Sequence, residues 1–222
     1  MNRYLSFVIK TASAALIPII LFSCAPVNLY TINMNYIPSK TIATGTDNIK
    51  KIQLTVARFI DARNIQDTML IGTVESPDGG MKPVLPKYSK PVDTVTAGIR
   101  EYLSAAGYSL SPQIPVWDLK NDSIEKRWGS VLIGGTIDKL EITCRREGVK
   151  KNYQANVKLT VVFADVRNAR IFHRMEIETS PSLIHVRFSE KILEEQINKA
   201  LSDSIEKVFG SVETIQNIIG EL

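Results

Sequence analysis

The clearest pattern in this 222-residue sequence is a strict alternation of apolar and polar side chains over residues 152–161, whose apolar phase continues to Phe163. The apolar positions are Tyr153, Ala155, Val157, Leu159, Val161 and Phe163. Because successive side chains of a strand point to opposite faces, this pattern predicts a strand with one face in the core and one in water. One-sided strands of this kind are typical of antiparallel sheets. An antiparallel sheet is therefore the central expectation for the fold.

Other segments are predicted to add strands to this sheet. Shorter alternations or apolar runs occur at residues 29–36, 52–60, 108–110, 131–144 and 171–177. Within the 131–144 segment the apolar phase changes near Gly134 and Gly135. A phase change inside one strand is what a β-bulge produces, so a single bulged strand is expected there.

Two further segments carry apolar residues at helical spacing. Residues 93–106 end before Gly107, a typical helix stop, and residues 189–210 begin at Ser189, a good N-cap. A weaker stripe at 212–219 predicts a short terminal helix. One-sided helices and a one-sided sheet can bury each other's apolar faces. The predicted fold class is α+β: a two-layer sandwich of a mostly antiparallel sheet with two helices on one face.

Residues 61–90 are predicted to form a long irregular segment, with a short extended piece at 69–74. The segment contains Pro77-Asp78-Gly79-Gly80 and further prolines. Loops of this length are uncommon and are usually functional or mobile. This segment is therefore a candidate for a partner contact or an active-site lid.

The N-terminal sequence is typical of an export signal. Arg3 and Lys10 are the only charges in residues 1–23, and Lys10 is followed by twelve uncharged residues. Such a run is too short to span a bilayer and fits the apolar region of a secretory signal peptide. The predicted organisation is a signal peptide at 1–23, a short tether at 24–28, and a single periplasmic α+β domain at 29–222.

The sequence Leu21-Phe22-Ser23-Cys24 resembles the lipobox of bacterial lipoproteins. In those proteins the cysteine carries a diacylglycerol and becomes the new N-terminus, so Cys24 is the predicted lipidation site. In Gram-negative lipoproteins an Asp after the cysteine retains the protein in the inner membrane, so Ala25 favours the outer membrane. The alternative is an ordinary signal peptide that happens to contain a cysteine. Five residues from Cys24 to Leu29 reach about 17 Å, which would hold the domain against its membrane.

The charge balance excludes a dense nucleic-acid-binding surface. The chain has 27 basic and 23 acidic residues, a net charge of +4. Removing residues 1–23 takes away two positive charges and no negative ones, which leaves a net charge of about +2. A nucleic-acid binder would carry a clustered stripe of Lys and Arg. No nucleic-acid partner is expected.

Several features of the chain are informative together: the sequence Ala57-Arg58-Phe59-Ile60-Asp61-Ala62-Arg63, the Ala106-Gly107-Tyr108 helix end, the Gly134-Gly135 strand and the closing helix with residues 198–204. This combination resembles YajG-type outer-membrane lipoproteins and, more broadly, auxiliary lipoproteins of ABC-type lipid transport systems. The resemblance spans roughly residues 29–210. It implies a periplasmic domain on a lipid anchor, with no established catalytic residues and no cofactor.

Asp61 and Arg63 form the first candidate site. Two residues apart in an extended segment, their side chains project to one side. They could provide a polar contact for a partner at the start of the 61–90 segment. The alternative is a surface ion pair that fixes how the chain leaves the preceding strand, worth at most about 1 kcal/mol.

Four basic residues around one predicted hairpin turn form the second candidate site: Arg145, Arg146, Lys150 and Lys151. Anionic headgroups are the obvious target, since each such residue near a charged surface contributes about 1 kcal/mol. The alternative is an ordinary solvated turn.

The remaining candidates favour structural roles. Cys144 is expected to be a buried strand residue, and His173 a core or edge residue. His185 lies in a predicted loop, and two histidines so separated make no recognisable metal site. Trp117 and Trp128 flank a polar loop and could cover the end of the sheet or touch headgroups. No catalytic residue and no metal ligand is assigned.

Three functions remain open at this point. The first is a lipid-anchored binding or accessory lipoprotein of the bacterial outer membrane that supports envelope transport or assembly, with an envelope protein as partner. The second is a lipoprotein activator of cell-wall synthesis, which would need a longer tether than five residues. The third is an enzyme with the 61–90 segment as a lid, which predicts a deep pocket holding titratable groups; the expectation is that the protein is not an enzyme.

Overall fold

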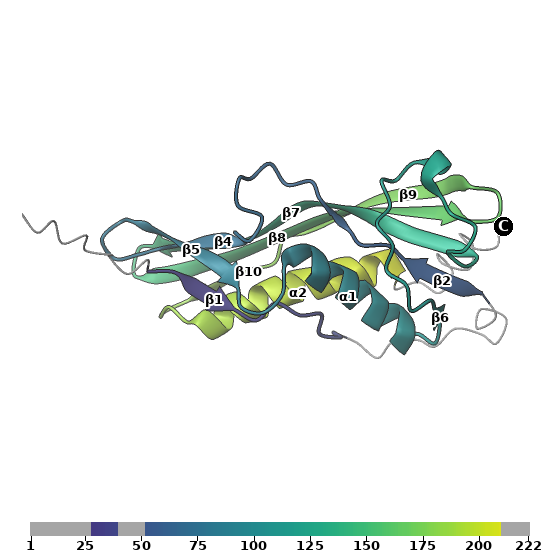
Figure 1. Ribbon diagram of the computed structural model, residues 1–222. Helices are drawn as coiled ribbons and strands as arrows, with labels where there is room; N and C mark the ends of the chain where they lie inside the picture. Colours follow the sequence, from purple (N-terminus) through teal and green to yellow (C-terminus); the bar gives the residue numbers. More distant parts are fainter. Residues whose placement is uncertain (1–27, 40–51, 210–222) are drawn as a thin grey trace, which may run out of the picture.

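The computed structural model describes residues 28–39 and 52–209, and Figure 1 shows their arrangement. The strands are β1 (Tyr30–Ile32), β2 (Gln53–Val56), β3 (Ile60–Asp61), β4 (Gly72–Glu75), β5 (Met81–Pro86), β6 (Ser109–Leu110), β7 (Val131–Glu147), β8 (Lys150–Asp165), β9 (Arg170–Thr179) and β10 (Ser182–His185). The helices are α1 (Pro91–Ala105) and α2 (Glu190–Phe209), with a 3₁₀ turn at Asn121–Ser123. Cys24, the signal sequence and the predicted helix at 212–219 lie outside the described residues.

The long β7–β8 hairpin runs along the length of the molecule (Figure 1). Its antiparallel pairing runs from Val131 opposite Asp165 to Glu147 opposite Lys150. At about 3.4 Å per residue, the 17 residues of β7 extend for roughly 55 Å. The pairing shifts register between Ile137 and Lys139, which confirms the predicted bulge and places it just after the glycine pair.

The sheet is mixed, which corrects the expectation of a mostly antiparallel sheet. Among the described residues, five of the nine strand pairs are parallel: β1–β5, β2–β6, and β7 with each of β2, β3 and β4. The longest pairs, β7–β8 and β8–β9, are antiparallel. The alternation in β8 indicates only that one face of the strand is buried more than the other. This difference in burial does not depend on the direction of the neighbouring strands.

Both helices pack on the same face of the sheet, as predicted. Residues of α1 and α2 share one apolar core with the odd-numbered positions of β8. The α2 contribution is Leu193, Ile197, Ala200, Leu201, Ile205, Val208 and Phe209. The α+β class and the two helices on one face are therefore confirmed.

Among residues 28–39 and 52–209, the segment between β6 and β7 covers the opposite face of the sheet at one end. Trp117 and Trp128 lie there in a second, smaller core against Val162 and Ala164 of β8. This core explains why the polar side of the alternation stops at residue 160. Both tryptophans are buried, so they cover the sheet and are not available to headgroups.

The stretch 61–90 is more regular than its sequence predicts. It contains β4 and β5, which form an antiparallel hairpin, and β5 also pairs with β1. Two prolines, Pro83 and Pro86, lie within β5 itself. Prolines and glycines favour a loop in the absence of tertiary information, but the pairing of β5 on both sides overrides that preference. An irregular segment remains between β3 and β4.

Candidate functional site

Asp61 and Arg63 form a buried ion pair at the point where the chain leaves β3. The Arg63 Nη2 and Asp61 Oδ2 atoms are 2.7 Å apart, and Nε donates to Oδ1 at 2.8 Å. The Arg63 side chain is only 5% exposed and the Asp61 side chain only 12%. Burial alone would raise the pKa of Asp61, but the hydrogen bonds and positive charge of Arg63 outweigh that effect and lower the pKa below its usual value.

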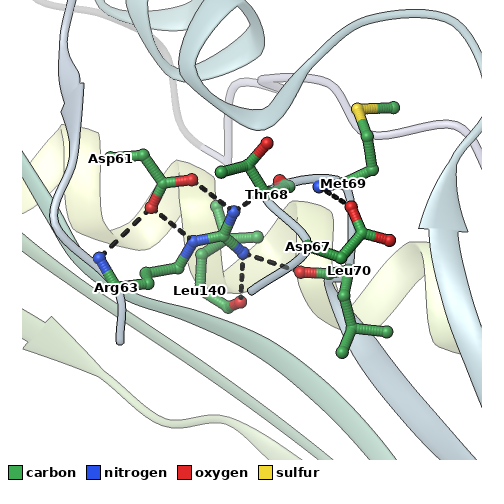
Figure 2. Close-up of polar contacts among 7 residues, drawn as sticks. All are labelled: Asp61, Arg63, Asp67, Thr68, Met69, Leu70 and Leu140. Carbon is green, nitrogen blue, oxygen red and sulfur yellow. Dashed lines mark hydrogen bonds and ion pairs between the residues drawn. The ribbon is translucent and has the colours of Figure 1, made fainter. Parts of the chain in front are cut away.

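The other donors of Arg63 bind backbone carbonyls (Figure 2). Nη1 donates to the carbonyl of Leu70 at 2.8 Å and to that of Leu140 at 3.3 Å. Nη2 also donates to the carbonyl of Thr68 at 2.7 Å. A guanidinium has five N–H donors, and in Arg63 all five are used within the protein.

The position of this arginine follows from a gap in the sheet. On one side of β7, β3 pairs with residues 136–137 and β4 pairs with residues 142–144. The bulge lies between these two stretches, and the Arg63 guanidinium reaches the β7 backbone there through Leu140. We call Asp61, Arg63 and the three carbonyls the arginine clamp. The clamp fixes the irregular segment against β7, so the geometry favours a structural role for Asp61 and Arg63. The ion pair is buried, whereas the sequence predicted a surface pair.

The four basic residues of the second candidate site do lie together at the tip of the β7–β8 hairpin. The turn contains Gly148 with a φ of 61°, a left-handed conformation that glycine adopts readily. Arg145, Arg146 and Lys150 are exposed, and Lys151 is half-buried. Within residues 28–39 and 52–209, none of the four is ion-paired with an acidic side chain. Lys151 Nζ donates to the Glu75 carbonyl at 3.3 Å.

A third polar site, which the sequence reading missed, runs along α2. The chain leaves β1 and continues extended beside this helix, and alternate backbone amides donate to helix side chains. The pairs are Asn33 N to Glu194 Oε2 at 2.8 Å, Asn35 N to Asn198 Oδ1 at 2.9 Å, Ile37 N to Ser202 Oγ at 2.9 Å and Ser39 N to Glu206 Oε1 at 2.7 Å. We call this arrangement the α2 ladder.

The α2 ladder works because two periodicities match. Two residues of extended chain advance about 6.8 Å, and four residues of helix advance about 6.0 Å. Polar side chains every four residues on one helix face can therefore serve every second amide of the strand-like segment. Glu194, Asn198, Ser202 and Glu206 have this spacing, and that regular polar stripe was the signal available in the sequence.

The remaining single candidates occupy structural positions. Cys144 is buried, and burial raises the pKa of its thiol. His173 packs against Phe163 with ring centroids 5.8 Å apart. His185 Nδ1 contacts the backbone of Arg187. No group of three or more metal-binding side chains occurs in the part of the chain that the structure describes.

A cavity of about 570 Å³ lies at the end of the molecule where β8 turns into β9, lined by residues that include Lys126 and Asp165. Asp165 Oδ1 accepts hydrogen bonds from the backbone amides of Arg167 and Asn168. This carboxylate therefore holds the turn together. The cavity lies far along β8 from the 61–90 segment, so that segment does not form a lid over it.

Comparison with solved structures finds several bacterial proteins of similar structure. A Xanthomonas campestris protein assigned to the family DUF330 superposes with a TM-score of 0.55 and 12% identity, over 86% of this chain and 99% of that one. A putative neuraminyllactose-binding hemagglutinin homologue from Helicobacter pylori gives 0.49 and 14% identity, over 86% and 100% of the two chains. The lipoprotein GNA1162 of Neisseria meningitidis gives 0.39 and 11% identity, over 72% and 99%.

No protein-family model matches the sequence, and no curated protein matches it significantly. At these identities the likeness to the Xanthomonas protein establishes a shared fold. Neither α1 nor α2, the two helices in the described ranges, has the length and hydropathy to cross a membrane.

Proposed function

We propose that this protein is a lipid-anchored accessory lipoprotein on the periplasmic side of the bacterial outer membrane, similar to the YajG type, that supports envelope transport or assembly. The observation that carries the proposal is the sequence Leu21-Phe22-Ser23-Cys24, which is followed after only five residues by β1 of a folded domain. The fold shared with the Xanthomonas protein is consistent with it. The role is binding and positioning, not catalysis, and it involves no nucleic acid.

The anchor is tested by replacing Cys24 with Ser and comparing the variant with Cys144→Ser as the matched control. Wild type and the control are expected to gain the mass of the acyl chains and to fractionate with membranes, because the buried thiol of Cys144 is not an acceptor. The Cys24→Ser chain should be soluble or uncleaved. A processed Cys24→Ser chain that still fractionates with membranes would contradict the anchor.

The choice of membrane is tested at Ala25. If the outer membrane is the destination, Ala25→Asp should move the acylated protein into the inner-membrane fraction of a density gradient. Ala25→Ser serves as the control and should leave the distribution unchanged. An unchanged distribution in the Ala25→Asp variant would refute sorting by this position.

The envelope partner is expected to bind beside the arginine clamp. A groove of about 330 Å³ lies there, with Ile60, Thr68 and Val116 in its lining. The Val116 side chain is 79% exposed, which leaves apolar surface free for a partner. A photo-crosslinking residue at Val116 should capture one defined envelope protein, and the same residue at Arg174 on β9 should not. Equal capture at both positions, or none at Val116, would count against this surface.

The activator of cell-wall synthesis fits less well because of reach. Tyr30 is six positions after Cys24, and this stretch extends to about 20 Å at most. If that function held, lengthening this segment would change activity strongly, whereas the accessory role should tolerate a few added residues.

A further inference from the structure

Three segments that are distant in the sequence meet at one end of the molecule: the β7–β8 turn, β10 and the start of β1 (Figure 1). β10 pairs with the first residues of β8, from Ser182 opposite Gln154 to His185 opposite Lys151. Phe188, just beyond β10, packs against Tyr30 with ring centroids 4.9 Å apart. The chain that follows β10 therefore returns to the point where the described N-terminal segment begins.

Strand directions show which way the chain arrives at Tyr30. β1 is parallel to β5, β5 is antiparallel to β4, and β4 is parallel to β7. Because β7 runs toward the Gly148 turn, β1 runs away from it. The residues that precede Tyr30 therefore approach from the side of that turn.

The register also gives the reach of the anchor. Tyr30 is opposite Val84, Val84 is opposite Gly72, and Gly72 is opposite Ile142. Tyr30 is thus level with Ile142, which lies six residues before Gly148, or about 20 Å along the strand. Tyr30 is also six positions after Cys24, a stretch that can extend for about 20 Å. An acyl chain on Cys24 can therefore enter a bilayer that the turn touches.

The side chains at this end have the composition of a membrane-contact surface. Val149 is 88% exposed, Val186 is 65% exposed and Ile184 is 53% exposed. Around them lie five basic residues: Arg145, Arg146, Lys150, Lys151 and Arg187. We call these eight residues the basic tip.

The acidic groups near the basic tip offset part of its charge. Glu147 lies in the turn itself, and Asp78 lies in the neighbouring β4–β5 turn. A carboxylate oxygen of Glu75 accepts a hydrogen bond from the backbone amide of Arg146 at 2.8 Å. Five cations with exposed apolar side chains between them suit a surface of anionic headgroups over hydrocarbon.

We propose that the basic tip docks onto the anionic phospholipid surface of the membrane that holds Cys24, so that the domain stands upright on the end of its β7–β8 hairpin. This inference rests on the proposed lipid anchor. It changes the expected geometry from a domain lying against the membrane to one whose far end, with the β8–β9 turn, is presented roughly 55 Å away along the hairpin.

Orientation is measured with the acylated full chain in vesicles of phosphatidylethanolamine and phosphatidylglycerol. One variant carries an environment-sensitive dye on Val149→Cys, and the matched control carries it on Arg167→Cys in the β8–β9 turn. Cys144 is buried, so labelling is confined to the introduced thiol. The dye at 149 should shift to the blue and be quenched by lipids with a quencher near the headgroup, and the dye at 167 should not. Equal quenching at both positions, or quenching at 167 alone, would overturn the proposal.

The charge requirement is measured separately by vesicle co-sedimentation, with the unacylated Cys24→Ser chain prepared as residues 24–222 so that the predicted signal peptide does not itself bind lipid. Lys150→Glu with Lys151→Glu should weaken binding to phosphatidylglycerol vesicles by about tenfold or more, an effect that added salt should shrink. Lys126→Glu with Arg127→Glu makes the same charge change at the far end and should weaken binding by less than about twofold. Equal losses would mean that only net charge attracts the protein, which refutes a defined docking surface.

Two further readouts separate the possible failures. Intact mass of the purified chain reports acylation of Cys24, so failure of the proposed anchor is detected without reference to the tip. If the dye at 149 ignores lipids but becomes shielded when envelope proteins are reconstituted in the same vesicles, the tip binds a protein and the lipid proposal is wrong.

Discussion

Arg63 and Arg146 belong to the two candidate sites that the sequence offers as possible contact surfaces, but their surroundings in the structure are opposite. Arg63 is almost completely buried, and every N–H of its guanidinium is bound inside the protein. Arg146 is exposed and, among the described residues, forms no ion pair with an acidic side chain. A buried cation with satisfied donors stabilises the fold, whereas an exposed cation remains available to a charged surface. Burial and partners, not residue type, separate structural from binding roles here.

The largest effect is expected for Arg63→Ala. The substitution leaves the Asp61 carboxylate buried without its partner and removes the hydrogen bonds to three carbonyls. Breaking a buried pair by removing one member typically costs about 3–5 kcal/mol. Urea unfolding should show a loss of this size, and Arg63→Lys should recover only part of it because an ammonium lacks the planar fork. A loss below about 1 kcal/mol would show that the clamp does not stabilise the fold.

A smaller effect, with a defined pH dependence, is expected for Asp61→Asn. The folded pKa of Asp61 is lowered from 3.8, so its ion pair stabilises the folded state above that value and loses this contribution as the pH falls through the folded pKa. At pH 7 the variant should be less stable than wild type by about 2 kcal/mol. The difference should shrink below pH 4 in unfolding measurements. A difference that grows toward acid pH would contradict the assignment.

The α2 ladder should give the next effect. Asn198→Ala removes the acceptor for the Asn35 amide and the donor to the Asn33 carbonyl, the latter at 3.1 Å. A loss of about 1–2 kcal/mol is expected. Hydrogen exchange should accelerate at the amide of residue 35, while Lys199→Ala on the exposed side of the helix should leave it unchanged. Unchanged exchange in Asn198→Ala would mean that the ladder bonds do not hold the segment.

The smallest effect on folding is expected at the basic tip. Arg146→Ala should change the free energy of unfolding by less than about 0.5 kcal/mol, because the side chain is exposed and no buried partner is left behind. Paired with Arg63→Ala in the same urea experiment, it tests the contrast directly. If both substitutions cost the same, the distinction between a clamp and a free surface is wrong.

Several parts of the fold followed from local patterns. The helices, the β8 alternation and the bulged single strand β7 were predictable because their periodicities reflect burial on one side of an element. The hairpin of β4 and β5 was not, since the prolines of β5 signal a loop and only pairing on both sides makes it a strand. Strand direction was also beyond local reasoning, because half-buried parallel and antiparallel strands alternate in the same way.

The candidate sites also differ in whether local sequence was enough to predict them. The four cations of the tip were found from sequence because a turn brings neighbours together without help from the rest of the chain. The carbonyl partners of Arg63 were not, since the Leu140 carbonyl lies 77 positions away from it. The α2 ladder joins segments separated by more than 160 positions, although its spacing of four was visible.

By itself the sequence predicted an export signal and a lipid anchor at Cys24, and it determined the two helices and the one-sided alternation of β8, because each depends on residues near one another in the chain. Tertiary structure alone decided that the sheet is mixed, that Arg63 is enclosed and that the basic tip lies at the end from which the N-terminal segment arrives. These features depend on strand order and register. Pairing between segments that are distant in the sequence sets strand order and register, and local periodicity does not reveal that pairing.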